Sequence, residues 1–346
     1  MVSFIKKLGL KIFLKFVEQE QVSRHIQGIV RQGNFALPNI ENEPPPYSAV
    51  EISKAGVSDR DDIVFITSRF RSGSTLLWNL FRQSGQCTSY YEPFNERQWF
   101  NSSLRGEGVD GSHRGVDDYW AEYDGLANLA NFYQEDWIRA DLLMTEQSWM
   151  PKMKHYIEEL VTAAPYRPVL QFNRIDFRLP WIKHHFPKAK LLHLYRNPRD
   201  QWCSFLRDPK LMNKDDVQNT YEDSFYLDVW CNDLARHYPV LDSLNTPHPY
   251  QRFYYLWKLS FLHGKQFSDL SISFEALTQN PTAQIESMFN LLNITGVDIQ
   301  KLSAVIQAPE PMRWKKYADE NWFKQHEDIC EQNLSLMLTK SPQEDK

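Results

Sequence analysis

Five consecutive residues, Arg71-Ser-Gly-Ser-Thr75, form a loop of small side chains and one cation shortly after the apolar run Ile63–Thr67. An apolar helical pattern, Leu76–Phe81, begins directly behind this loop. A buried strand that ends in such a loop and opens a helix presents free backbone N–H groups and the positive end of the helix dipole to one point. The segment therefore predicts a site for a phosphate-like anion. The alternative is an arginine-rich turn that only closes a strand.

This loop differs from the phosphate loop of nucleoside triphosphatases, whose pattern is GxxxxGK(S/T). That pattern needs a glycine near position 68 and a lysine after its second glycine, and the sequence has Ser68 and Ser74 there. Gly73 permits close approach to a ligand. We expect the backbone N–H groups of Ser72, Gly73, Ser74 and Thr75 to hold the anion.

A second anion site is predicted at the start of a later helix. Asn197 is a natural N-cap, Pro198 suits the first helical position, and Asp200 completes a start that resembles a capping box. Arg196 would then lie at the carboxyl end of the preceding strand, and Ser204 would lie about two turns into the helix. Because ligands of open parallel sheets bind at that edge, we expect the guanidinium and the hydroxyl to converge on one anion.

Short apolar runs alternate with helical patterns along most of the chain, which is typical of a parallel sheet covered on both faces. We therefore expect an α/β fold with a single main domain and helical insertions. The predicted strands are Ile63–Thr67, Thr88–Tyr91, Val169–Phe172, Lys190–Tyr195 and Leu270–Phe274, and the predicted helices are Thr75–Gln83, Leu179–His185, Arg199–Leu206 and Thr282–Leu292.

The two anion segments together resemble the two cofactor-binding signatures of sulfotransferases that use 3′-phosphoadenosine 5′-phosphosulfate (PAPS). The likeness runs from about residue 63 to 294. It includes Phe186–Lys190, Ser273–Leu277, Asn280-Pro281 and Met288–Leu292. It implies a P-loop nucleotide-kinase-like parallel sheet, PAPS as co-substrate and 3′,5′-adenosine bisphosphate (PAP) as product.

The resemblance also implies roles for individual residues. The first loop would bind the 5′-phosphosulfate, Arg71 would neutralise the departing phosphate, and Arg196 with Ser204 would bind the 3′-phosphate. The segment Arg313–Tyr317 resembles a basic stretch that closes over the nucleotide, and its alternative is a solvated basic turn. The cofactor-binding residues implied in this way are Arg71, Ser72, Gly73, Ser74, Thr75, Arg196, Ser204, Arg313 and Lys315.

The expected catalytic base is Glu92. The Lys-Thr-His motif of the cytosolic phenol and steroid branch is absent after Phe172, where Asn173-Arg-Ile-Asp176 stands. Tyr91-Glu-Pro93 is similar to the position where the carbohydrate and tyrosylprotein branches place a catalytic glutamate, and arginine at position 71 also resembles those branches. Glu92 would accept the proton of the acceptor hydroxyl. The alternative is a surface carboxylate or a partner of Arg97.

Arg174 and Glu96 are further candidates, in this case for contact with the acceptor. Arg174 and Arg199 both lie near the predicted sheet edge, where each could touch a ligand or form a structural ion pair. The acceptor favoured by the resemblance is a carbohydrate or a glycolipid that is sulfated on a hydroxyl or an amine. No metal ion is required, because cationic side chains and helix N–H groups can supply the positive charge.

The chain is expected to divide into four parts. On a helix, Lys7, Lys11 and Lys15 would stack beside an apolar face, so the first part either docks on the main domain or lies on an anionic membrane. The insertion is glycine-rich at first and then helical and aromatic, and would supply a lid or acceptor wall. The parts are an amphipathic helix (1–33), a proline-rich linker (34–62), the α/β domain (63–295, with the insertion at 97–168) and a C-terminal segment (296–346).

Composition limits the class of protein. The 346 residues are 42% hydrophobic and 24% charged, as in ordinary globular proteins, and the net charge of −5 does not favour nucleic acid as a partner. Four scattered cysteines without metal-ligand spacing favour a reducing, cytoplasmic location, with contact to a membrane periphery through residues 1–17 left open. The competing interpretations are a nucleotide kinase or triphosphatase on the same sheet and a non-catalytic nucleotide-binding protein at a membrane.

Overall fold

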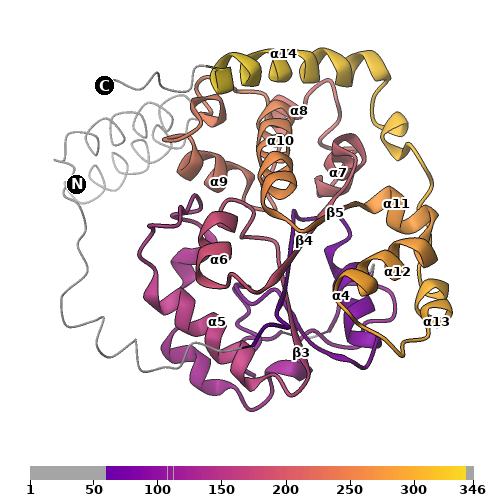
Figure 1. Ribbon diagram of the computed structural model, residues 1–346. Helices are drawn as coiled ribbons and strands as arrows, with labels where there is room; N and C mark the ends of the chain where they lie inside the picture. Colours follow the sequence, from indigo (N-terminus) through magenta and orange to yellow (C-terminus); the bar gives the residue numbers. More distant parts are fainter. Residues whose placement is uncertain (1–59, 107, 112, 340–346) are drawn as a thin grey trace, which may run out of the picture. The chain divides into compact units, whose positions relative to one another are not determined.

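Five parallel strands form a sheet in the order β2-β3-β1-β4-β5 (Figure 1). The central strand, β1, is buried along its whole length because helices cover both faces of the sheet. The predicted α/β fold with a parallel sheet is confirmed. The strands are β1 Val64–Ser68, β2 Cys87–Tyr91, β3 Arg167–Phe172, β4 Lys190–Tyr195 and β5 Leu270–Ser273.

The computed structural model does not describe the whole chain. The predicted N-terminal helix (1–33) and nearly all of the predicted linker (34–62) lie outside the described residues. The described residues are 60–106, 108–111 and 113–339.

Each face of the sheet has its own hydrophobic core, because side chains alternate along β1. Phe65 packs on one face with α5 and α6. Val64 and Ile66 pack on the other face with α4, α11, α12 and α13. Figure 1 shows these two groups of helices on opposite sides of the strands. The helices are α4 Ser74–Gln83, α5 Pro151–Ala163, α6 Leu179–His185, α11 Phe274–Gln279, α12 Pro281–Leu291 and α13 Ile299–Ala304.

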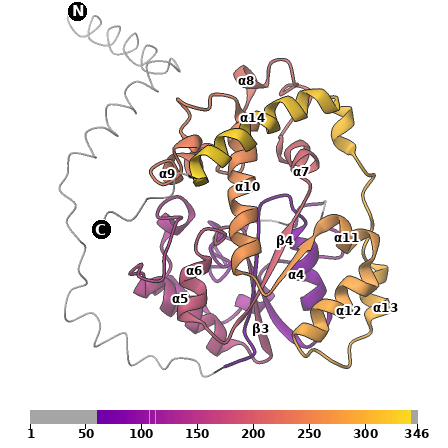
Figure 2. The ribbon, with the colours of Figure 1, turned by 45° about the horizontal axis from the view of Figure 1, so that its top comes forward.

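A third core joins the remaining helices. Its largest buried side chains are aromatic and include Trp202, Trp230 and Tyr250. Helix α10 connects this core to the sheet, since it contacts α14 as well as β4 and β5, and Figure 2 shows it running from the sheet toward α14. These helices are α7 Pro198–Phe205, α8 Val217–Thr220, α9 Leu227–Leu234, α10 Pro249–Phe267 and α14 Glu320–Thr339.

The insertion predicted at 97–168 is less helical than expected. It contains a single α-helix, α5, among the described residues, and otherwise short 3-10 turns and irregular chain. Its aromatic rings mostly fill the core beside α5, because large apolar side chains gain most from burial: Tyr123 and Trp137 are 0% and 1% exposed. Within the insertion, the side chains that line the cavity described below come from its first part. The 3-10 helices are η1 Ala121–Tyr123, η2 Ala127–Asn131, η3 Glu135–Ile138, η4 Pro239–Leu241 and η5 Arg313–Lys316.

The four cysteines are free thiols in the structure. Burial raises the pKa of Cys87 to about 11 and that of Cys330 to about 12, so both thiols stay protonated near neutral pH.

In the described part of the chain, no helix has the length and apolar character needed to cross a bilayer.

Candidate active site

A cavity of about 1060 Å³ opens at the edge of the sheet where the strands end. Open parallel sheets bind their ligands at this edge. The wall carries seven Arg or Lys side chains and four carboxylates, although the whole chain has a net charge of −5, so the cavity suits an anionic ligand. Every strand contributes: Arg71 follows β1, Glu92 follows β2, Arg174 follows β3, Arg196 follows β4 and Phe274 follows β5.

The loop between β1 and α4 turns sharply into the cavity. Arg71 and Gly73 both adopt left-handed backbone conformations, with φ of 64° and 96°. Gly73 is the N-cap of α4 and no side chain caps that helix, so its first N–H groups lack intrahelical partners beside the cavity. The ring of Phe274 also approaches so closely that a Cβ at position 73 would lie 2.3 Å from it. Glycine is thus required both for the backbone conformation and for the close packing.

Ser72 departs from the prediction. Arg71, Gly73, Ser74 and Thr75 line the cavity, whereas Ser72 does not. Its hydroxyl and its N–H both donate to the carbonyl oxygen of Arg69, at 2.6 and 3.3 Å, and the residue is fully buried. The turn itself uses the donors that were expected to bind the anion.

Arg71, Arg196 and Ser204 meet at one end of the cavity. Nε of Arg71 donates to Oγ and to the carbonyl oxygen of Ser204, at 3.1 and 3.0 Å. Nη1 of Arg196 donates to the carbonyl oxygen of Arg71 at 3.0 Å, and its Cζ lies 4.9 Å from the ring centroid of Phe274. Burial lowers the pKa of Arg196, and its buried Nε has no hydrogen-bond partner among the described residues. The two predicted residues are therefore brought together, with Arg71 between them.

The start of α7 confirms one expectation and corrects another. The side chain of Asn197 accepts hydrogen bonds from the N–H groups of Arg199 and Asp200, at 3.0 and 3.4 Å, so the predicted N-cap is confirmed. Asp200 does not complete a capping box. The N–H of Asn197 donates instead to Oε1 of Glu275, and Asp200 accepts from the N–H of Trp314, both at 3.0 Å. Asp200 thus joins α7 to the C-terminal segment.

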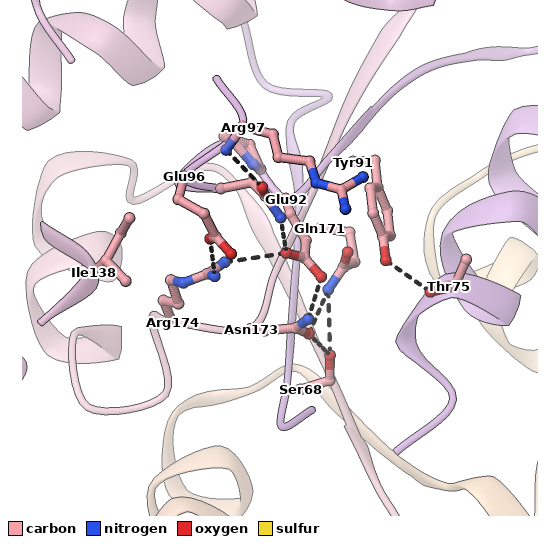
Figure 3. Close-up of polar contacts among 12 residues, drawn as sticks. Ser68, Thr75, Tyr91, Glu92, Glu96, Arg97, Ile138, Gln171, Asn173 and Arg174 are labelled. Atoms are coloured by element: carbon pink, nitrogen blue, oxygen red, sulfur yellow. Dashed lines mark hydrogen bonds and ion pairs between the residues drawn. The ribbon is translucent and has the colours of Figure 1, made fainter. Parts of the chain in front are cut away.

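Glu92 is a buried carboxylate, 5% exposed, in a left-handed conformation with φ of 39°. Three side chains donate to it. Asn95 donates to Oε2 at 2.6 Å. Asn173 donates to Oε1 and Arg174 donates to Oε2 at 3.0 Å (Figure 3). The alternatives of a surface carboxylate and of a partner of Arg97 are therefore wrong. The carboxylate is held in one orientation at the cavity wall.

The side-chain amides of Gln171 and Asn173 lie beneath Glu92, and no sequence motif marks them. Oδ1 of Asn173 accepts from Oγ of Ser68 at 3.1 Å and from Nε2 of Gln171 at 2.9 Å. All three residues are buried, and they come from the ends of β1 and β3. Because both amide orientations are fixed by these bonds, Asn173 presents Nδ2 to Glu92 (Figure 3).

The remaining cations divide between structural and cavity positions. Arg174 pairs with Glu92 and with Glu96 while lining the cavity. Arg199 forms a bidentate ion pair with Glu327 of α14, at 2.8 and 2.7 Å, and does not line the cavity. Of its two expected roles, Arg199 therefore has the structural one.

The C-terminal basic segment reaches the cavity with a different lysine from the one expected. Arg313 lines the cavity. Lys315 does not line it and lies with Nζ 5.6 Å from the ring centroid of Trp314, whereas Lys316 does line it. The short helix η5 turns successive side chains in different directions, which places Lys316 and not Lys315 at the wall.

Two residues that no sequence motif marks, His113 and Tyr226, are among those that line the cavity. His113 comes from the glycine-rich part of the insertion, where no motif marks a lone histidine. Tyr226 lines the cavity in a left-handed conformation with φ of 62°, unusual for an aromatic residue. Strained backbone of this kind gathers at functional sites, but it is not visible in a sequence. Among the described residues, no three His, Cys, Asp or Glu side chains are placed to hold a metal ion.

The sequence pattern of the sulfotransferase family matches residues 63–298, more than half of the chain, and the chain belongs to this family. No curated protein sequence matches it. Among solved structures, it is similar to a sulfotransferase domain from the curacin biosynthetic pathway (16% identity, TM-score 0.40), with 81% of this chain and 98% of that one covered. It is also similar to sulfotransferase STF9 from Mycobacterium avium (12% identity, 86% and 80% covered, TM-score 0.42) and to mouse sulfotransferase SULT7A1 complexed with PAP (10% identity, 81% and 90% covered, TM-score 0.38).

Proposed function

We propose that this chain transfers a sulfuryl group from PAPS to a hydroxyl or an amine of an acceptor. The observation that carries the proposal is one cavity in which the two groups of residues expected to bind anions meet a buried carboxylate. The loop ending at Thr75 supplies helix N–H groups, Arg196 and Ser204 form the second group, and Glu92 lies in the same wall. Two anion sites in one cavity fit a nucleotide that carries phosphate at two positions, as PAPS does.

The proposed chemistry uses these residues directly. Glu92 accepts the proton of the acceptor hydroxyl. A bond forms between the acceptor oxygen and sulfur while the bond between sulfur and the phosphate oxygen breaks, and PAP leaves with the electron pair. Arg71 and the N–H groups of α4 stabilise the negative charge on the leaving phosphate. Arg71 also donates to Ser204, so its guanidinium lies between the loop before α4 and the group formed by Arg196 and Ser204.

The acceptor is proposed to be a carbohydrate or a glycolipid. The proposal rests on the resemblance of the Glu92 and Arg71 segments to the carbohydrate and tyrosylprotein branches, and on half-buried aromatic rings in the cavity wall. These rings are Phe70, Phe225 and Tyr226. Aromatic rings in a cavity wall can pack against a flat apolar surface such as that of a sugar ring.

Ligand binding and transfer assays test the proposal. PAP should raise the temperature of unfolding, because a ligand that binds only the folded state stabilises it. Incubation with radiolabelled PAPS and a panel of glycans, glycolipids and phenols should then label one class of acceptor. Stabilisation by ATP with Mg²⁺ but not by PAP would favour a nucleotide kinase or triphosphatase. PAP binding without transfer to any acceptor would favour a non-catalytic nucleotide-binding protein.

A further inference from the structure

His113 brings an imidazole ring to the first turn of α4. Its Nε2 lies 3.3 Å from Oγ1 of Thr75, and its Nδ1 lies 2.5 Å from Oη of Tyr119. Oγ1 of Thr75 also lies 2.9 Å from Oη of Tyr91, the residue before Glu92 (Figure 3). The imidazole is therefore on the β2 side of the cavity, where Glu92 is.

This position is separate from the group formed by Arg196 and Ser204. The sheet order places β2 at one edge and β4 on the opposite side of β1, so the residues that follow these two strands reach the cavity from different sides of the loop after β1. A nucleotide that spans the loop of α4 would have its 3′-phosphate toward β4. Its sulfuryl group must then point toward β2, because the acceptor has to meet Glu92.

The hydrogen bonds of Tyr119 define the protonation of the imidazole. Oη of Tyr119 accepts from the N–H of Asp110 at 3.0 Å, and Tyr119 is 4% exposed. Among the described residues, Nδ1 of His113 is the acceptor for the hydroxyl proton of Tyr119. We expect this bond to form, because a buried donor without an acceptor destabilises the fold. Burial lowers the pKa of His113, so the ring is neutral near pH 7 and carries a single N–H. That hydrogen is therefore on Nε2, facing Thr75.

We propose that Nε2–H of His113 donates a hydrogen bond to the sulfuryl group of PAPS during transfer, with Tyr119 as the positioning residue that fixes the tautomer. This inference rests on the proposed function. Oγ1 of Thr75, which Nε2 faces, belongs to the loop proposed to hold the phosphosulfate, so the donor lies beside the oxygen atoms where charge develops. A donor in that place lowers the barrier, and removal of one such donor typically costs roughly 10²- to 10³-fold in kcat. PAP lacks the sulfuryl group, so its affinity should depend little on His113.

Three variants of the full chain test the inference. His113→Phe keeps a ring of similar size but has no donor, and should lower kcat by roughly 10²- to 10³-fold while PAP affinity changes less than about threefold. His113→Gln can place its amide nitrogen near the position of Nε2, and should keep kcat within about tenfold of normal. Tyr119→Phe leaves the imidazole tautomer free, and should lower kcat by about tenfold with PAP affinity again unchanged. His184→Phe, on an exposed position of α6 outside the cavity, is the control.

The measurements are kcat with the acceptor found above, PAP affinity and the temperature of unfolding for each variant. Near-normal kcat in His113→Phe would overturn the inference. So would equal losses of kcat and PAP affinity, because the contact would then be made to a phosphate or to the fold. If His113→Phe does not fold, the other two variants decide. The inference then requires that His113→Gln keeps kcat within about tenfold of normal. It also requires that Tyr119→Phe lowers kcat without lowering the temperature of unfolding. Failure of the wild-type chain to bind PAP or transfer sulfate would instead refute the proposed function.

Discussion

Nη1 of Arg174 donates to Oε2 of Glu92 across 3.0 Å, and its Nη2 donates to Oε2 of Glu96 across 2.7 Å. The two carboxylates differ in burial, since the side chain of Glu92 is 5% exposed and that of Glu96 is 43% exposed. One buried guanidinium therefore balances a carboxylate inside the wall and another at its rim. The pairing places a compensating positive charge beside the buried carboxylate of Glu92, as a buried charge requires.

The first prediction concerns Glu92→Gln. Loss of a general base typically lowers the rate by roughly 10²- to 10⁴-fold, so turnover should fall by that factor while PAP affinity stays within a few-fold. The partners of Glu92 in the structure are all donors. The amide NH₂ of glutamine would face one of them, so the free energy of unfolding should also fall, by about 1–3 kcal/mol. Steady-state kinetics and denaturant unfolding measure the two effects.

Glu96→Gln is the matched control, because it removes the same charge from the same guanidinium at an exposed position. It should leave turnover within a few-fold of normal. Retained turnover in Glu92→Gln together with its loss in Glu96→Gln would mean that the base has been assigned to the wrong carboxylate.

The second prediction concerns the proposed 3′-phosphate group. Arg196→Ala should weaken PAP binding on the order of 10- to 100-fold, because a charge-assisted contact contributes roughly 1.5–3 kcal/mol. Ser204→Ala should act in the same direction with a smaller effect. Affinity for adenosine 5′-phosphosulfate, which lacks the 3′-phosphate, should change little in both variants. Calorimetric titration with the two nucleotides measures the difference.

Arg199→Ala serves as the control for that prediction, since Arg199 pairs with Glu327 away from the cavity. It should lower stability without changing PAP affinity. Equal losses of affinity for both nucleotides in Arg196→Ala would indicate a displaced loop, because Arg196 also donates to the carbonyl oxygen of Arg71.

The third prediction concerns Gly73→Ala. A left-handed conformation costs an alanine roughly 1–2 kcal/mol, and at this position the new methyl group would also lie 2.3 Å from the ring of Phe274. The free energy of unfolding should therefore fall by at least about 2 kcal/mol, and PAP affinity should also fall. Gly85→Ala isolates the backbone cost, because Gly85 has a φ of +68° and open space around its Cβ. It should cost about 1–2 kcal/mol and leave PAP affinity unchanged.

The fourth prediction concerns acid stability. Burial lowers the pKa of His193 to about 4, and the ring is bonded to Ser271 at 2.7 Å. The unfolded chain binds this proton near pH 6.5, so between about pH 6.5 and 4 the unfolded state holds more protons and stability falls as pH falls. The loss from this group is on the order of 3 kcal/mol.

His193→Asn tests that assignment, because its amide can still bond to Ser271 but does not titrate. The pH dependence of unfolding between pH 4 and 7 should become shallower. Some dependence will remain, since burial also lowers the pKa of His185 to about 4 and of His248 to about 3. An unchanged slope would show that His193 takes up no proton in this range.

Local features of this protein could be read from the sequence. The strand, loop and helix around residues 63–83 and the N-cap at Asn197 depend on residues that are close together in the chain, since periodic burial and capping act within a few residues. The alternation of strands and helices then implied the parallel sheet. The sheet in turn brought Arg71, Glu92 and Arg196 to one edge.

The partners of those residues were decided by tertiary structure. Arg174 donates to Glu92, the N–H of Trp314 donates to Asp200, and the ring of Phe274 packs against Gly73. Each pair is joined across 82 residues or more by the packing of separate elements, and either partner alone has many possible companions. A sequence can show that a carboxylate follows a strand. Which donors surround it, and whether it is buried, depends on how the whole chain packs.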